Sequence, residues 1–168
     1  MSAPLSGLER VGLHRYGDNI DTDSILAGRY LTMRTSAELG AHCMENIDPD
    51  FVARVRKGDV MIGGKNFGSG SSREHAPLAI QAAGISCVVA ISFARIFYRN
   101  AINIGLPVFE CAELVQAVRA EDRLAVDLKR GRFDLNGQSF QAIALAPYVQ
   151  SIVDAGGLVP FISAKLST

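Results

Sequence analysis

The sequence lacks an excess of charge of either sign and has no long apolar run. Its 168 residues contain 17 Lys and Arg and 17 Asp and Glu, so the formal charge is zero. A nucleic acid or a membrane surface calls for a basic face, and the even balance argues against either as the main partner. No run approaches the ~18 apolar residues of a membrane span. Residues 1–13 lack the basic start and apolar stretch of a signal peptide, so none is expected.

Cysteine is also scarce. Cys43, Cys87 and Cys111 are far apart and form no Cys-x-x-Cys pair. They offer neither a disulfide framework nor a zinc knuckle, and they favour a reducing compartment, which we take to be the cytoplasm. Spacing alone leaves cluster ligation open, but the preferred interpretation is that they are buried and pack as small apolar side chains.

Apolar runs and turn-forming residues alternate through most of the chain. In chain order we expect a strand (10–16), a loop rich in turn formers (18–28), a short helix (36–45) capped by Ser36, and strands at 59–64, 86–92 and 106–111, separated by helices that end at Gly84 and Gly105. From residue 59 to 111 this order is strand–helix–strand–helix–strand. Such alternation is typical of parallel crossover units.

The last third of the chain has a different pattern. Residues 111–120 predict a helix, and 123–145 alternate around Asn136-Gly137, a strong hairpin signal. A last helix ends at Gly156-Gly157 and is followed by a tail. There is no internal repeat and no linker. The fold class is therefore predicted as α/β, one domain over 1–168 with parallel central strands and antiparallel hairpins outside.

A glycine-rich turn, GGKNFGSGSSREH at 63–75, joins a predicted buried strand to the next helix. Backbone N–H groups at the start of a helix attract anions, and glycines let a ligand approach the backbone closely. No lysine follows the glycines as in a Walker A loop, Arg73 stands where a dinucleotide turn has its third glycine, and Gly-x-Ser-x-Gly is absent. A carboxylate remains, because hydroxyls, backbone donors and a guanidinium would bind it.

A simpler interpretation of the turn is also open. Ser71 and Glu74 have the spacing of a helix capping box, with the glycines serving only as a turn. That interpretation explains one serine and one glutamate but not the glycines or Arg73. Pro77 would lie too deep in a helix that starts at Ser71 or Ser72, so the helix must be kinked or begin later.

Two further segments carry polar side chains. Arg95, Arg99 and Asn103 are four residues apart on one predicted helix face, which is typical of a solvated stripe. The start of that helix should nevertheless lie beside the glycine turn, at the carboxyl edge of the parallel strands. In DNIDTD, the carboxylates of Asp18, Asp21 and Asp23 do not fit an EF-hand. Local turn bonding explains most of them, and a salt bridge to an arginine or histidine could explain one.

Three stretches together resemble one family: GDNIDTDSILAGRYL, GGKNFGSGSSREHAPLAI and ISFARIFYRNAINIGLPV. They look like the small subunits of isopropylmalate isomerases, the swivelling domain of the aconitase superfamily as a separate chain. The resemblance spans about residues 10–160. It implies a hydro-lyase that removes water from a 2-hydroxy dicarboxylic acid and adds it back in the other orientation. It also implies a large partner subunit whose [4Fe–4S] cluster acts as the Lewis acid, so that this chain alone is inactive and holds no cofactor.

The resemblance also implies roles for individual residues. Ser71 matches the catalytic base, and Ser72 and Arg73 match groups that hold a substrate carboxylate. Arg34 matches another substrate-binding arginine, and Asp23 matches a carboxylate that orients catalytic groups. Serine is a poor base at its ordinary pKa, so fixed dipoles in the turn must stabilise its alkoxide.

The segment after Tyr30-Leu31 is implied to meet the variable arm of the substrate. Relatives that bind tricarboxylates tend to carry an arginine there, whereas this chain has Thr32 and Met33. This difference favours 2-isopropylmalate over homocitrate or citrate, with citramalate and dimethylmalate as close competitors and with Arg34 as a possible arginine for a third carboxylate. A carboxylate-binding module without catalysis, and a homo-oligomer of the isolated chain, remain open.

Overall fold

The computed structural model describes residues 9–167. Most of the segment on which the expectation of no signal peptide rests, residues 1–8, lies outside the described residues. The strands are β1 (Val11–Arg15), β2 (Val60–Ile62), β3 (Cys87–Ala90), β4 (Val108–Glu110), β5 (Arg123–Asp127), β6 (Arg132–Leu135) and β7 (Gln138–Gln141). The helices are α1 (Thr22–Ile25), the short 3-10 helix η1 (Gly28–Tyr30), α2 (Ser36–Gly40), α3 (Phe51–Arg54), α4 (His75–Ala82), α5 (Arg95–Asn103), α6 (Ala112–Ala117), α7 (Pro147–Asp154) and α8 (Leu158–Leu166).

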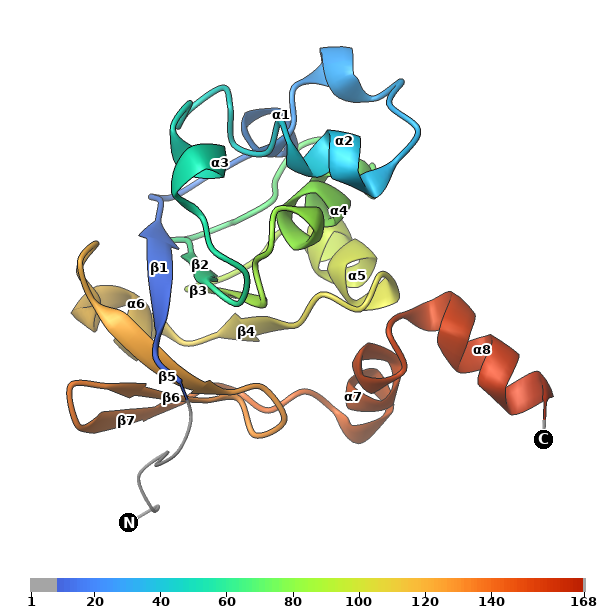
Figure 1. The fold of residues 1–168 in the computed structure, drawn as a ribbon. Coiled ribbons are helices and arrows are strands. Elements are labelled where there is room, and N and C mark those ends of the chain that lie inside the picture. Colours follow the sequence, from blue (N-terminus) through green and yellow to red (C-terminus); the bar gives the residue numbers. More distant parts are fainter. Residues whose placement is uncertain (1–8, 168) are drawn as a thin grey trace.

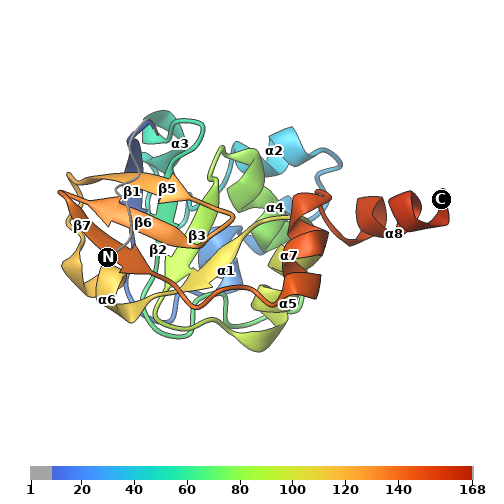
Figure 2. The same cartoon turned by 90° about the horizontal axis from the view of Figure 1, so that it is seen from below.

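The strands form one seven-stranded mixed sheet in the order β4-β3-β2-β1-β5-β6-β7 (Figure 1). Strands β1 to β4 are parallel, with Leu13 opposite Val60 and Val60 opposite Cys87. Strands β5, β6 and β7 are antiparallel and all extend the sheet beyond β1 (Figure 2). The predicted α/β class with parallel and antiparallel parts is confirmed. The antiparallel part lies on one side only, because β5 pairs directly with β1.

Each face of the parallel strands has its own apolar core. Alternate residues point to opposite faces, so Met61 and Val88 enter one core while Val60 and Val89 enter the other. The first core is closed by helices that include α2, α4, α5 and α7, and the second by α6 and the inner face of β5–β7. Burial on both faces is typical of parallel strands. It explains why these strands are short apolar runs rather than alternating ones.

The hairpin and both helix stops are confirmed. Asn136 and Gly137 have φ of 51° and 85° and connect β6 to β7, and positive φ at both central residues is what a type I′ turn requires. Gly84 and Gly105 lie just past α4 and α5 with φ of 110° and 82°. Glycine at this place ends a helix because it adopts the left-handed conformation without strain.

Three local predictions were wrong. The loop 18–28 contains α1, because the Asp21 side chain accepts a hydrogen bond from Ser24 N and caps a short helix. The cap of α2 is Thr35 rather than Ser36: Thr35 is extended and completes a capping box with Glu38. The expected tail after Gly157 is the helix α8.

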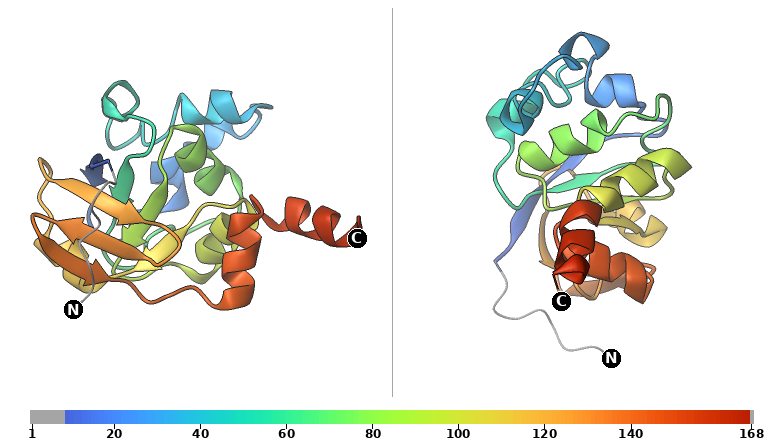
Figure 3. Two further views of the ribbon diagram at one scale, coloured as in Figure 1. Left: turned by 60° about the horizontal axis from the view of Figure 1, so that its bottom comes forward. Right: turned by 90° about the vertical axis from the view of Figure 1, so that its right-hand side faces the viewer.

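Helix α8 extends away from the sheet at the C-terminal end (Figure 3). Gly156 and Gly157, with φ of 92° and 127°, turn the chain between α7 and α8. A side chain on Gly157 would lie 2.5 Å from the carbonyl oxygen of Asn103, so the turn sits against the end of α5. Within residues 9–167, no helix is both long enough and apolar enough to cross a membrane. The prediction of one domain over 1–168 stays a prediction.

Candidate functional site

The glycine-rich turn lies at the carboxyl edge of the parallel strands, as predicted. It follows β2 and is bonded to the loops that follow β1 and β3. Gly68 N donates to Ile20 O over 2.7 Å, and Ala94 N donates to Phe67 O over 2.9 Å. Three loops from three neighbouring strands therefore meet here. The carboxyl edge of such strands is where ligands usually bind.

The glycines allow this close approach. Gly68 has φ of 85°, and a Cβ there would lie 2.1 Å from Cγ of Phe97 on α5. Gly70 has φ of 107°, and its Cβ would lie 3.0 Å from Oγ1 of Thr22. Larger residues at these two places would strain the backbone and push the neighbouring loops apart. The glycines are therefore required by packing inside the site, in addition to any approach of a ligand.

A cleft of about 200 Å³ opens beside the turn. It is lined by Asp21, Thr22, Asp23, Leu26, Gly28, Leu31, Gly70, Ser71, Arg73, His75 and Ala76. The cleft thus brings together three of the predicted site residues, Asp23, Ser71 and Arg73. Its walls come from α1, the segment after it, and the chain that leads into α4.

Helix α4 begins at His75, and its N-cap is Glu74 without a side-chain bond. The capping-box interpretation of Ser71 and Glu74 is therefore wrong. Because the helix begins later than Ser71, Pro77 lies in its first turn, where proline is tolerated. The hydroxyl of Ser71 is therefore not used as a cap of α4.

Ser71 is instead bonded to Thr22 on α1. Ser71 N donates to Thr22 Oγ1 over 3.1 Å, and the two hydroxyl oxygens are 3.2 Å apart. Thr22 is buried, whereas Ser71 is exposed at the cleft. Sequence reasoning missed Thr22, whose only signal is its place between Asp21 and Asp23.

The cleft has a positive side. The first N–H groups of α4 have no acceptor inside the helix and point toward its N-terminal end. Arg73 is exposed in the cleft and forms no ion pair within residues 9–167. Nδ1 of His75 is buried and has no hydrogen-bond partner among the described residues. A carboxylate would find unused donors here.

The three carboxylates of DNIDTD bond to backbone groups. Asp21 caps α1, Asp23 Oδ1 accepts from Gly28 N over 3.2 Å, and Asp18 Oδ1 accepts from Lys65 N over 2.7 Å. Local bonding holds for Asp21 and Asp23, while Asp18 ties its loop to the glycine turn. No salt bridge from any of them to an arginine or histidine forms in the described part of the chain.

Helix α5 contributes to the site through an unpredicted residue. Asn100 is buried and donates to Ser72 O over 2.8 Å, which holds the turn next to Ser71. Arg95 and Arg99 are exposed, as expected for a solvated stripe, and Asn103 is half-buried. The start of α5 does lie beside the turn.

The remaining predicted residues lie near the cleft without lining it. Ser72 is exposed and follows Ser71 directly. Thr32 and Arg34 are exposed on the segment after η1, and Met33 is half-buried against the first core. The apolar wall of the cleft is instead made by Leu26 and Leu31.

The cysteines lie apart from this cleft. All three are buried free thiols, Cys43 in the first core and the other two in the second. Burial raises the pKa of Cys87 to about 12, so the thiolate that binds metal is disfavoured. Among the described residues no three His, Cys, Asp or Glu side chains are grouped to hold a metal ion. These residues do not fit an iron–sulfur cluster.

Comparison with known proteins agrees with the fold and the motifs. Residues 13–113 match the family model described as the aconitase C-terminal domain. The 3-isopropylmalate dehydratase small subunit of Caldicellulosiruptor bescii is 53% identical over 155 residues, covering 91% of this chain and 93% of that protein. The 2,3-dimethylmalate dehydratase small subunit of Eubacterium barkeri is 54% identical over 152 residues, covering 89% and 93%.

A solved structure is also similar. The crystal structure of 3-isopropylmalate dehydratase from Methanocaldococcus jannaschii aligns with a TM-score of 0.89 and 38% identity, over 94% of this chain and 95% of that one. The chain therefore belongs to the aconitase C-terminal domain family, among the dehydratase small subunits of that family. The family resemblance predicted from the three motifs is confirmed.

Proposed function

We propose that this chain is the small subunit of a 3-isopropylmalate dehydratase, which interconverts 2-isopropylmalate and 3-isopropylmalate in leucine biosynthesis. The observation that supports this most is that one cleft holds both Ser71, whose hydroxyl bonds to Thr22, and Arg73, whose guanidinium forms no ion pair within residues 9–167. A base and a carboxylate-binding cation at one place suit removal of a proton next to a carboxylate. The buried free thiols agree with a reducing compartment, which we take to be the cytoplasm.

In the proposed reaction, Ser71 takes a proton from the carbon next to a substrate carboxylate. The electrons of the broken C–H bond form the C=C bond, the C–O bond on the neighbouring carbon breaks, and the departing hydroxide takes up a proton from solvent to give water. Addition of water in the opposite orientation returns the proton from Ser71. Arg73, with Ser72 beside it, binds the carboxylate. Asp23, in the lining of the cleft, orients the catalytic groups, and Arg34, outside that lining, binds the substrate.

A large partner subunit completes the site in this proposal. The Lewis acid that assists departure of the hydroxyl is a [4Fe–4S] cluster, which we assign to that subunit because the residues described here do not fit one.

The walls of the cleft support a branched apolar substrate. Leu26 and Leu31 would pack against an isopropyl group, which gains roughly 1–3 kcal/mol in an apolar pocket. A third carboxylate would lack a partner among the residues that line this wall, and burial of an unpaired charge is costly. Thr32 and Met33 would meet the outer end of the arm when the site closes. Methyl-substituted malates are the second choice, since the relative from Eubacterium barkeri is named for dimethylmalate.

The test is reconstitution with a cluster-loaded large subunit. The isolated chain is expected to fold without dehydratase activity, and addition of the large subunit should produce it. Values of kcat/KM on 2-isopropylmalate, 2,3-dimethylmalate and cis-homoaconitate then rank the substrates. Turnover by the iron-free isolated chain would overturn the proposal, a preference for cis-homoaconitate would overturn the substrate, and Thr32→Arg should shift preference toward the tricarboxylate.

A further inference from the structure

Two hydrogen bonds join Thr22 and Ser71, and while Ser71 is neutral only the one from its backbone N–H has a fixed direction. A backbone N–H can only donate, so Thr22 Oγ1 accepts the bond from Ser71 N. The hydroxyl proton of Thr22 is left over, and within residues 9–167 the acceptor at hydrogen-bond distance is Ser71 Oγ, 3.2 Å away. When Ser71 is an alkoxide it can only accept. The Thr22 hydroxyl then donates to the negatively charged oxygen.

Thr22 is held in place by bonds on both sides. Its N–H donates to Ser69 O over 2.7 Å, and its carbonyl accepts from Leu26 N over 2.9 Å. The residue is 7% exposed, and its side chain lies against Gly70, where a Cβ would come within 3.0 Å of Oγ1. The donor is therefore fixed before any substrate arrives. A donor that needs no rearrangement stabilises the charge of an ionised Ser71 most effectively.

Thr22 also links the position of the base to α1. The hydroxyl fixes both the backbone and the side chain of Ser71, which lies on an exposed segment ahead of α4. The bond from Asn100 to Ser72 O holds the same segment from the α5 side. Ser71 is thus held between two elements that lie on either side of the turn.

We propose that Thr22 is a positioning residue for this reaction: it orients Ser71 and donates a hydrogen bond that lowers the pKa of the Ser71 hydroxyl. The inference rests on the proposed function, because it assumes that Ser71 is the base. Thr22 is not expected to touch the substrate. Its loss should lower kcat and leave KM little changed, since the bond stabilises the ionised Ser71 that takes the proton and Thr22 does not contact the substrate.

The test uses the assembled two-subunit enzyme with Thr22→Val, Thr22→Ser and Ser71→Ala in parallel. Thr22→Val removes the hydroxyl at nearly constant volume and should cut kcat by about 10²-fold, as loss of one fixed donor does. Thr22→Ser keeps the hydroxyl and should restore most of the activity. The acid limb of the kcat–pH profile should move to higher pH in Thr22→Val, because Ser71 would ionise less readily. A purely structural role would not move this limb.

The two possible failures are distinguishable. If Ser71→Ala is inactive but Thr22→Val keeps wild-type kcat and pH profile, the role of Thr22 is overturned and the proposed function stands. If Ser71→Ala itself turns over normally, the proposed base is wrong. Should Thr22→Val not fold, Thr22→Ala against Thr22→Ser gives the same comparison, and equal activity of those two variants overturns the inference.

Discussion

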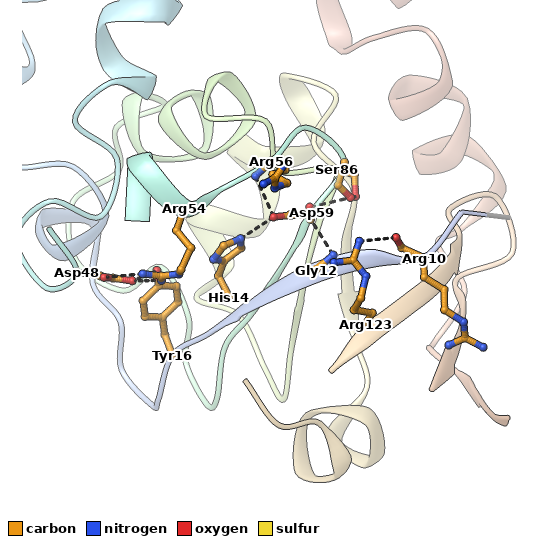
Figure 4. Close-up of polar contacts among 11 residues, drawn as sticks. Arg10, Gly12, His14, Tyr16, Asp48, Arg54, Arg56, Asp59, Ser86 and Arg123 are labelled. Carbon is orange, nitrogen blue, oxygen red and sulfur yellow. Dashed lines mark hydrogen bonds and ion pairs between the residues drawn. The ribbon is translucent and has the colours of Figure 1, made fainter. Parts of the chain in front are cut away.

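The two edges of the parallel strands both carry polar groups, but those groups are used differently. At the amino edge, the buried carboxylate of Asp59 accepts bonds from Gly12 N (3.1 Å), His14 Nε2 (2.8 Å) and Arg56 N (2.9 Å). The side chain of Ser86 donates to the carbonyl oxygen of Asp59 (Figure 4). These bonds join β1, the approach to β2 and the approach to β3. The buried pair of His14 and Asp59 therefore holds these segments of the sheet together.

At the carboxyl edge, the polar groups keep unused bonding capacity. Arg73 has no ion pair among the described residues, Ser71 has one hydroxyl partner, and Nδ1 of His75 has none within residues 9–167. All three line one cleft. Residue type alone does not separate the edges, because each has a histidine, a carboxylate and a serine. Nδ1 of His14 lacks a partner among the described residues, as Nδ1 of His75 does. What separates the edges is the bonding of the other groups: Asp59 and Ser86 are bonded to neighbouring segments, whereas Ser71 and Arg73 line the cleft.

The largest effect should come from Ser71→Ala at the carboxyl edge. Loss of a positioned base should cut kcat of the assembled enzyme by about 10²–10⁴-fold. The free energy of unfolding should hardly change, because Ser71 does not cap α4. Steady-state kinetics and a urea unfolding curve on the same variant measure both. A loss of stability together with a normal kcat would show that Ser71 serves the fold and not the reaction.

Asp59→Ala should give the converse result at the amino edge. Three donors lose their acceptor, and one of them, His14 Nε2, is buried. Removal of one partner from a buried polar pair costs about 3–5 kcal/mol of unfolding free energy. The kcat per folded molecule should stay near the wild-type value. Chemical denaturation measures the free energy of unfolding, and kinetics at low temperature measure kcat of the folded variant. A large loss of kcat with unchanged stability would show that this edge takes part in the chemistry.

Arg73→Lys should have a smaller but specific effect. Lysine keeps the charge but cannot offer the two parallel donors of a guanidinium. Loss of one charged hydrogen bond, roughly 1.5–3 kcal/mol, corresponds to about 10–100-fold in kcat/KM. Arg99→Lys on the exposed face of α5 is the matched control and should be neutral. Equal kinetics for wild type and Arg73→Lys would remove the carboxylate-binding role.

The smallest effect should come from Thr35→Ala, outside both edges. This change breaks the capping box of α2 and should cost about 1 kcal/mol of stability. Ser36→Ala, the position first expected to be the cap, should cost less. The midpoints of the urea unfolding curves of Thr35→Ala and Ser36→Ala measure both losses of stability. A larger loss of stability in Ser36→Ala would contradict the observed cap.

The sequence predicted the strands, most of the longer helices and the edge, but not α1, α3, α8 or the bonds between loops. Apolar runs, Gly84, Gly105 and Asn136-Gly137 define strands and turns locally, so these were found. Thr22 bonds to Ser71 across 49 residues, and Asn100 bonds to Ser72 across 28. Such pairs depend on which loops meet after folding, and no local pattern contains that information. The cap of α2 was missed by one residue because Thr35 and Ser36 are both good caps, and only the backbone conformation separates them.

The most direct measurement is exchange of the substrate's own proton with solvent. The assembled enzyme is incubated with 2-isopropylmalate in D₂O, and NMR follows deuterium at the carbon from which the proton is removed. If Ser71 is the base at the carboxyl edge, Ser71→Ala should slow this exchange by the same ~10²–10⁴-fold as kcat, while Asp59→Ala should exchange at the wild-type rate per folded molecule. Exchange at the wild-type rate in Ser71→Ala would contradict the account.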